Sequence, residues 1–256
     1  MSKALTKKET TAVALPPELD GAWGEETYDN SDILIPRLLL MQGQSDFVAS
    51  GKAKVGDIVK STTGQVYGDA TSPVSVIPLS MWKDLTVEKH NGKKWEYAYM
   101  EKTLKDSERE WTNKEGTWRR NTNLNFFVIL AKDAGREQEA LAAMEKGETP
   151  DVDAFVMPCH LKFTRTSYNT GKKLATHFAI MQQFKKPAAM KMFNLGAKRM
   201  DSDEGPYQVY TLEEGDKTPV EFMYTAKKWY DILAKSKNDV KVHDASVAEP
   251  EVLDAF

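Results

Sequence analysis

The sequence predicts a mainly β or α+β fold, in which a small, strongly bent antiparallel sheet or barrel carries helical additions. Two observations lead to this prediction. Short apolar or alternating segments with glycine and proline boundaries recur along the chain, and few stretches have the periodicity of a helix. With 256 residues and 41% hydrophobic content, the chain can bury one sizeable core.

Strand signals come first along the chain. In the apolar run 33–40, Pro36 removes a backbone donor and disfavours a long helix, so we expect a buried strand or a short strand–helix junction there. The segments 57–60 and 65–67 lie between glycines and predict a small hairpin. A further strand is expected to begin at Val74. The N-terminal part of the domain is therefore predicted to be β-structure.

The clearest local signal is Asn91-Gly92, which predicts a hairpin because this pair tolerates the positive φ angles of a type I′ turn. Alternation along the strand that follows would place Trp95, Tyr97 and Tyr99 on one face. Core packing is the default role of such a face, and a platform for bases is the alternative.

The middle of the chain combines a polar stretch with further strands. Residues 101–123 predict a long, partly mobile loop or an extended hairpin arm, whereas the apolar run 125–130 predicts a central strand. Strands are also expected at 153–157, where Pro158 would end the strand, and at 207–212.

Helical spacing occurs in three segments. In the first, Ala140, Leu141 and Met144 share one face and Gly147 can end the helix. The other two are predicted from apolar stripes, namely Leu174, Phe178 and Met181 in one, and Phe222, Ala226, Trp229, Tyr230 and Leu233 after Pro219 in the other. Gly171 makes the start of the second helix uncertain.

Charge divides the chain into three parts. Residues 1–31 predict a disordered acidic leader, 32–237 a single domain, and 238–256 a flexible acidic tail with five acids and one lysine. A single cysteine, Cys159, excludes an intramolecular disulfide and fits a reducing compartment. Neither a signal peptide nor an apolar run of the roughly 20 residues that a bilayer requires is present, so we expect a cytoplasmic protein without a membrane partner.

The strongest functional signal is the basic segment 154–200, which contains no Asp or Glu although the whole chain has a net charge of −3. Its cations are Lys162, Arg165, Lys172, Lys173, Lys185, Lys186, Lys191, Lys198 and Arg199. Aromatic residues lie between them. Cations attract a polyanionic backbone and rings stack on exposed bases, so the segment predicts a surface for single-stranded nucleic acid. A solvated charged face is the alternative.

From this segment and the hairpin we derive the expected contacts. Phosphates would be neutralised by Lys162, Arg165, Lys172, Lys173, Lys198, Arg199 and, from the hairpin, Lys94. Bases would stack on Tyr168, Phe193, Trp82 and Trp95. Trp118, beside Arg119-Arg120, is a further candidate, for which core packing is the alternative.

Signals for catalysis are poor. No P-loop is present, the four histidines lack metal-ligand spacing, and Cys159-His160 are strand neighbours whose side chains point to opposite faces. We therefore expect no enzyme, no cofactor and no metal. A nuclease with spaced carboxylates remains an alternative that incubation with DNA and Mg²⁺ or Mn²⁺ would test.

The end of the chain, 247–256, is acidic and closes on Phe256. With this tail, the segment Lys162–Lys173 and the strand-rich layout, the chain resembles the phage-type single-stranded DNA-binding proteins. The resemblance implies an OB-fold-like core and sequence-nonspecific binding in support of DNA replication, recombination and repair. It also implies a tail that competes with DNA and recruits replication proteins such as a polymerase or helicase-primase, through Glu249, Glu251, Asp254 and Phe256.

Two other functions stay open at this point. A strand-annealing recombination protein would use the same basic face and assemble into rings or filaments, so a homo-oligomer is also left open. A virion or host-interaction protein would instead turn its basic patch to acidic protein surfaces. Tryptophan fluorescence that does not quench with single-stranded DNA would favour the latter.

Overall fold

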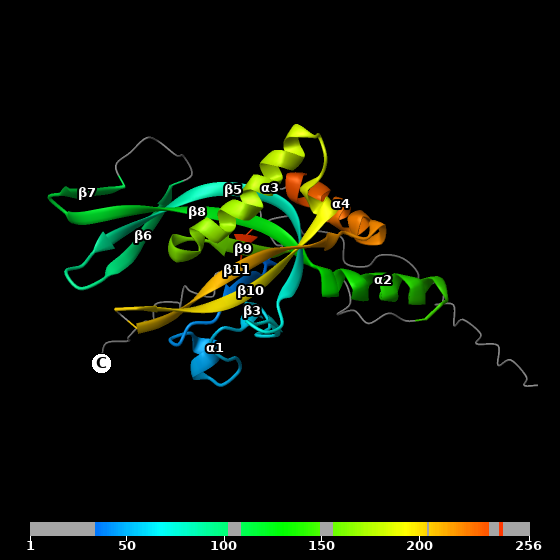
Figure 1. Ribbon diagram of the computed structural model, residues 1–256, viewed down its shortest axis with the longest axis horizontal. Coiled ribbons are helices and arrows are strands. Elements are labelled where there is room, and N and C mark those ends of the chain that lie inside the picture. The colour runs from blue at the N-terminus through cyan, green and yellow to red at the C-terminus, as the bar shows by residue number, and fades with distance from the viewer. Residues whose placement is uncertain (1–33, 102–108, 149–155, 204, 236–240, 243–256) are drawn as a thin grey trace, which may run out of the picture.

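The computed structural model describes residues 34–101, 109–148, 156–203, 205–235 and 241–242 (Figure 1). The predicted leader 1–31 lies outside the described residues. The same holds for the four residues predicted to form the partner-binding tail, Glu249, Glu251, Asp254 and Phe256.

One sheet of ten strands forms the body of the protein. Its strands are β2 (Arg37–Leu40), β3 (Ile58–Lys60), β4 (Val66–Gly68), β5 (Val74–His90), β6 (Trp95–Glu101), β7 (Glu110–Asn113), β8 (Gly116–Leu130), β9 (Cys159–Phe163), β10 (Lys191–Ser202) and β11 (Gly205–Lys217). They follow the order β11-β10-β5-β8-β9-β2-β3-β4, with β6 paired to β5 and β7 to β8. A separate parallel pair consists of β1 (Leu34–Ile35) and β12 (Lys241–Val242).

The sheet is strongly curled into a half-barrel, which confirms the predicted barrel-like α+β architecture (Figure 1). Part of the bend lies in β5, where the pairing with β8 shifts between Pro78 and Ser80. A proline lacks the N–H that a central ladder needs, and a bulge at that point kinks the strand. The sheet is mixed rather than wholly antiparallel, because β2 pairs with β9 in parallel.

Side-chain hydrogen bonds join the edge strand β11 to the region of β2, on the other side of the curled sheet. The Tyr210 hydroxyl of β11 donates to the carbonyl of Leu38 in β2 at 2.9 Å. The Gln42 side chain, just after β2, bonds to both the carbonyl and the N–H of Gln208, at 3.0 and 2.9 Å. These bonds form a seam between β11 and the β2 end of the sheet. The seam thus occupies peptide groups of β11 that face away from β10.

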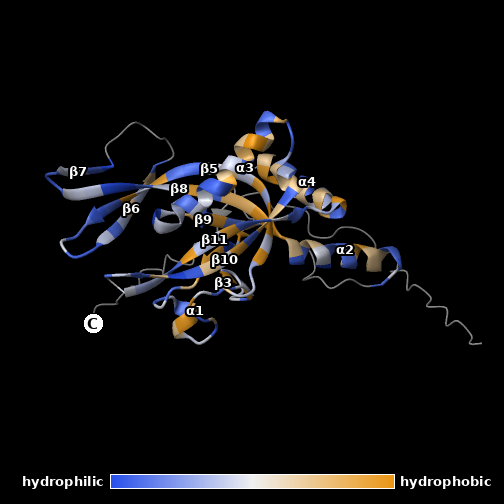
Figure 2. Ribbon diagram, in the orientation of Figure 1, coloured by the Kyte–Doolittle hydropathy of each residue, from blue (hydrophilic) through white to orange (hydrophobic). Residues whose placement is uncertain are grey.

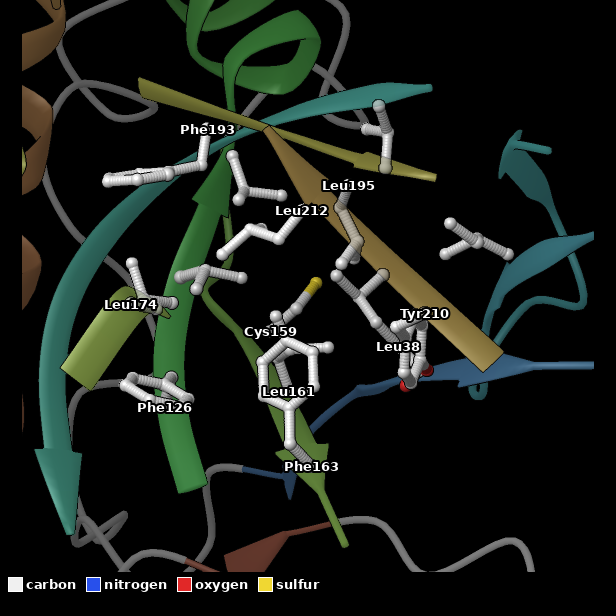
Figure 3. Close-up of a cluster of buried hydrophobic side chains, with 14 of the residues drawn as sticks. Leu38, Phe126, Cys159, Leu161, Phe163, Leu174, Phe193, Leu195, Tyr210 and Leu212 are labelled. Carbon is white, nitrogen blue, oxygen red and sulfur yellow. The ribbon is translucent and has the colours of Figure 1, made fainter. Parts of the chain in front are cut away.

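The concave face of the sheet encloses the main core (Figure 3). Its buried side chains come from β2, β3, β5, β8, β9, β10 and β11, and from one helix. Among them are Leu38, Phe126, Cys159, Leu161, Phe163, Leu174, Phe193, Leu195, Tyr210 and Leu212. Figure 2 shows apolar residues where these strands converge and a more hydrophilic sequence along β6 and β7. The core therefore lies at one end of the long strands.

Helices cover both faces of the sheet. They are α1 (Asp46–Ala49), α2 (Ala131–Glu145), α3 (Tyr168–Gln183) and α4 (Val220–Lys235), with 3-10 turns at Arg165–Ser167 and Ala188–Met190. α3 adds Leu174 to the main core. α2 and α4 pack on the opposite face, where Ile77, Ile129, Ala226 and Leu233 belong to a second buried cluster.

Gly171 allows α3 to approach the sheet closely. A Cβ atom at this position would lie 2.7 Å from the Cβ of Phe163, closer than real side chains come. Glycine is a weak helix former, but at this position the absence of a side chain permits the close contact between the helix and the sheet. Both Phe163 and Leu174 are fully buried at this crossing.

Two helix and strand predictions need correction. The predicted face of the first helix is wrong, because Leu141 and Met144 are 41% and 49% exposed. α2 instead buries Glu137, which accepts a hydrogen bond from Thr225 of α4 at 2.6 Å. The strand predicted at 153–157 falls mainly outside the described residues, and β9 begins after Pro158 rather than ending there.

The predicted hairpin at Asn91-Gly92 is confirmed, since β5 and β6 pair antiparallel from His90 and Trp95 onward. The turn is not type I′, because only Gly92 has a positive φ, of 92°. The Asn91 side chain instead accepts hydrogen bonds from the N–H groups of residues 93 and 94, at 3.0 and 2.9 Å. The side chain thus holds a four-residue loop in place of a two-residue turn.

Candidate nucleic-acid interface

Beyond the core, β5 and β8 continue as an arm that also contains β6 and β7 (Figure 1). Their pairing is unbroken from Ser80 and Phe127 to His90 and Thr117. Side chains alternate between two faces along paired strands. Even-numbered residues of β8 therefore continue the concave face that carries Phe126, and odd-numbered residues lie on the outer face.

The concave face of the arm carries a row of rings and cations, which we call the tryptophan row: Lys89, Tyr99, Trp111, Trp118 and Arg120. Trp111 and Trp118 are cross-strand partners whose rings are nearly parallel, with centroids 6.1 Å apart. Arg120 lies 4.0 Å from the Trp111 ring and Lys89 lies 5.1 Å from the Trp118 ring. Tyr99 completes the row at 6.5 Å from Trp118 and is 44% exposed.

The two cations of this row differ in their partners. Arg120 donates to Glu101 at 2.8 Å, so its charge is balanced within the arm. Lys89 makes no ion pair with any described residue. A guanidinium or ammonium over an aromatic face is attracted by the negative face of the ring. The row thus combines rings at the surface with one uncompensated positive charge.

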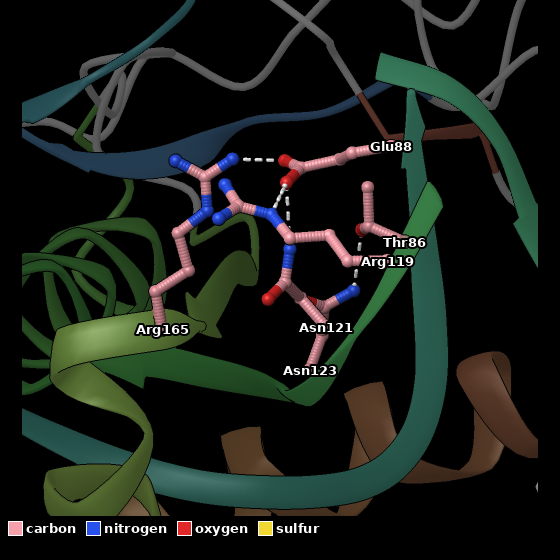
Figure 4. Close-up of polar contacts among 6 residues, drawn as sticks. All are labelled: Thr86, Glu88, Arg119, Asn121, Asn123 and Arg165. Carbon is pink, nitrogen blue, oxygen red and sulfur yellow. Dashed lines mark hydrogen bonds and ion pairs between the residues drawn. The ribbon is translucent and has the colours of Figure 1, made fainter. Parts of the chain in front are cut away.

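The outer face of the arm carries a charged ladder centred on Glu88 (Figure 4). Glu88 accepts hydrogen bonds from Arg119 at 2.6 Å and from Asn121 at 2.8 Å, and it pairs with Arg165. The Arg119 guanidinium in turn lies 4.2 Å from the Trp95 ring. Burial opposes ionisation of Glu88, but the bonds and charges of the two arginines outweigh it and hold its pKa below the usual value.

Nearer the core, the outer face continues as a buried polar network. Asp84 accepts from Asn123 at 2.6 Å and from Asn125 at 2.8 Å. Asn125 donates its amide to Asp84, so its oxygen accepts from Nε2 of His160 at 2.9 Å. Trp82 stacks on the His160 ring with centroids 5.3 Å apart. Trp82 is thereby held in the network, and the prediction that it offers a free face to bases is not supported by its position.

The predicted common face of Trp95, Tyr97 and Tyr99 is wrong. The pairing of β5 with β6 shifts between Val87 and Glu88, which inserts one extra residue into β6. Trp95 consequently lies with His90 on the outer face, and Tyr99 lies with Trp118 on the concave face.

The cations of the basic segment do not share one trough. Lys162 lies half-buried on β9 opposite Asn125, on the outer face. Lys198 and Arg199 are exposed neighbours on β10 and point to opposite faces, and Arg199 lies 3.4 Å from Asp201. Phe193 is only 4% exposed and packs in the main core, so the prediction that it stacks on a base is wrong.

The remaining predicted contacts lie at the start of α3 and at the hairpin tip. Lys172 is exposed over the Tyr168 ring, with its ammonium 5.1 Å from the ring centre. The ammonium of Lys173 lies 3.5 Å from the carbonyl of Leu212. The Lys94 side chain is 73% exposed and lies 3.5 Å from Glu96. These groups are accessible, and Lys172 with Tyr168 keeps the predicted pairing of a cation with a ring.

The sequence did not identify the tryptophan row as a unit. Trp118 and Arg120 stand out in the chain, but their joining to Tyr99 and Lys89 depends on the register of four strands. Within the described residues, no group of three or more His, Cys, Asp or Glu side chains is placed to hold a metal ion. None of the described helices has the length and apolar content needed to cross a lipid bilayer.

The fold and this surface define an α+β protein with a curled sheet and an aromatic arm. The chain belongs to the family described as Pam3 phage gp34-like protein, whose family model matches residues 6–239. It is therefore a member of a bacteriophage protein family. No curated protein and no solved structure matches the chain.

Proposed function

We propose that this phage protein binds single-stranded DNA without sequence preference, in support of replication, recombination and repair, and acts as a binder rather than an enzyme. The observation that carries the proposal is the tryptophan row, in which Trp111, Trp118 and Tyr99 line a solvent-facing strip between two cations. Every base has a face that can stack on such a ring, so stacking tolerates any sequence.

Stacking on this row would distinguish single strands from duplexes. Bases of a duplex are already stacked on one another, whereas those of a single strand can lie on protein rings. Each stacked base is worth about 1–3 kcal/mol, so two or three rings account for useful affinity. The proposal therefore includes a preference for unpaired DNA.

We assign phosphate contacts to three cations that have no acidic partner among the described residues and lie along the proposed DNA surface. These are the half-buried Lys89 in the row, and the exposed Lys172 at the start of α3 and Lys198 on β10. Arg119 and Arg165 are already paired with Glu88 and contribute less net charge to DNA. Each phosphate contact releases counterions, so the affinity is expected to fall steeply with salt.

Titration of intrinsic fluorescence with single-stranded and duplex oligonucleotides at two salt concentrations tests the proposal. We expect quenching by the single strand, weaker at the higher salt, and loss of most of it in Trp118→Ala. The matched control is Trp229→Phe in α4, since this ring packs in the second buried cluster. If single-stranded DNA leaves the fluorescence unchanged, the proposal is wrong and a virion or host-interaction role is favoured.

The proposal extends to partners through the acidic end of the chain. Glu249, Glu251 and Asp254 precede the aromatic Phe256. An acidic segment with a terminal ring suits a basic-rimmed apolar pocket on a replication protein such as a polymerase or helicase-primase. Phe256→Ala would be expected to abolish such recruitment while leaving DNA binding in place.

A further inference from the structure

A groove of about 820 Å³ lies between α3, α4 and the central part of β5. Its apolar lining includes Leu79, Met81, Phe178, Ala189, Met223 and Ala226. We call it the α3–α4 groove. It lies apart from the tryptophan row, none of whose residues line it.

The rim of the α3–α4 groove is basic. Four lysines line it, Lys83, Lys185, Lys186 and Lys227, and no acidic residue does. Lys227 is bonded to Asp231 at 2.6 Å, whereas the other three make no ion pair with any described residue. An apolar floor with uncompensated cations around it favours an occupant that is both acidic and apolar.

One of the rim lysines is held in a costly backbone conformation. Lys185 has a φ of 51° and follows the C-terminus of α3. Its N–H bonds to the carbonyl of Gln182 at 3.0 Å, and that of Lys186 bonds to Met181 at 2.9 Å. This is a Schellman cap, whose left-handed position is usually glycine. A lysine there gives up helix stability and places a cation at the groove.

The C-terminal segment 243–256 has the matching chemistry. It contains four acids, Asp244, Glu249, Glu251 and Asp254, and no lysine or arginine. Its last five residues include Leu253 and Phe256. A segment of this composition could place one phenylalanine ring and aliphatic groups on the floor and its carboxylates on the rim.

The attachment point of this segment lies close to the groove. Val242, the last described residue, pairs with Ile35. Ile35 packs in the second buried cluster together with the groove residues Leu79, Ala189 and Ala226. Fourteen extended residues span up to about 46 Å, so the chain end can reach any part of the groove.

We infer that the C-terminal segment 243–256 docks in the α3–α4 groove of its own chain, with Phe256 on the apolar floor and its acids against the rim lysines. Because the segment is tethered, docking needs only modest intrinsic affinity. The inference is independent of DNA binding and can be tested without DNA.

The test uses the full-length chain with the photoreactive p-benzoylphenylalanine in place of Phe256. Irradiation followed by peptide mapping is expected to locate crosslinks at Met81 and Met223. The charge reversal Lys185→Glu with Lys186→Glu is expected to reduce the yield about fivefold, whereas the exposed control Lys217→Glu leaves it unchanged. Crosslinks outside the groove, or a product of twice the mass from a second copy, would overturn the inference.

A second variant separates docking from helix stability. Lys185→Gly relieves the left-handed conformation and is expected to raise the melting temperature by about 2–4 °C while lowering the crosslink yield. If Lys185→Gly is more stable and its crosslink yield is unchanged, Lys185 has no role in docking. The inference that the rim lysines bind the acids of the segment is then wrong.

Discussion

The aromatic rings of the core pack on one another, whereas those of the arm pack on cations as well as on one another. Phe126 lies edge-on to Phe163 at 5.7 Å and is fully buried. In the arm, the Trp111 ring neighbours both the Trp118 ring and the guanidinium of Arg120. The arm has no second layer of described structure over its rings, so cations replace hydrophobic neighbours as packing partners. The rings of the core therefore stabilise the fold, whereas the rings of the arm are available to a ligand.

The largest effect should come from the core. Phe126→Ala would remove a ring that is 0% exposed and touches Phe163 and Phe178, so we expect a loss of about 3–5 kcal/mol in the free energy of unfolding. Urea unfolding followed by circular dichroism measures it. Leu141→Ala, on the exposed side of α2, is the control and should change stability by less than about 0.5 kcal/mol. A loss below 1 kcal/mol in Phe126→Ala would contradict this account of the core.

The next effect concerns Glu88, which ties the arm to the start of α3. Glu88→Gln leaves Arg119 and Arg165 without their carboxylate, and we expect a loss of about 2 kcal/mol, since Arg165 is half-exposed. The pKa of Glu88 is lowered, so its contribution is present above the usual glutamate pKa and is lost as pH falls through the lowered pKa.

The pH dependence provides the check on this prediction. Urea midpoints of the native chain and of Glu88→Gln should differ most near neutral pH and converge as the pH falls through the lowered pKa of Glu88. A difference that stays constant over this range would show that the carboxylate charge is not what stabilises the ladder.

A substitution in the tryptophan row is expected to change stability less than the two preceding variants and to weaken DNA binding. Trp111→Ala should lower affinity for single-stranded DNA about tenfold, because one stacking platform is lost, and should cost less than about 1 kcal/mol of stability. Fluorescence anisotropy of a labelled oligonucleotide measures the affinity. The control is Tyr97→Ala, an exposed ring on the outer face. An equal loss of affinity for single-stranded DNA in both variants would show that the concave face of the arm has no special role in binding.

The smallest effect is expected at the chain end. Deletion of residues 247–256 removes three acids and should raise affinity for single-stranded DNA about twofold at low salt, since these acids repel the negatively charged DNA backbone. The gain should vanish at 0.5 M salt because charges are then screened. Unchanged affinity at low salt would exclude competition between this segment and DNA.

Local signals in the sequence were enough to predict the strand-rich half-barrel, the hairpin after His90 and the helix after Pro219. Their causes are short-range: apolar alternation, a turn-forming pair and a helix start. Strand β10 escaped prediction because its core residues Phe193 and Leu195 lie within a run dominated by lysines and methionines. The many charged residues of this run make the alternation of the buried residues Phe193 and Leu195 hard to recognise in the sequence.

The candidate site was less predictable, because the acids that neutralise the basic segment lie elsewhere in the chain. Glu88 pairs with Arg165 across 77 residues, and Glu214 pairs with Lys191 across 23. Absence of acids along a segment therefore did not translate into a uniform basic surface. Tyr99 lies on the concave face, and not on the face of Trp95 and Tyr97, because of one bulge in β6. No local sequence pattern indicates this bulge.

The seam at β11 bears on assembly. The N–H and carbonyl of Gln208 are bonded to Gln42, and those of Tyr210 to Ser167 and Thr170. These peptide groups are closed to an incoming strand, so neighbouring molecules cannot extend the sheet along this stretch. A ring or filament of the kind that strand annealing requires would have to be joined through other surfaces.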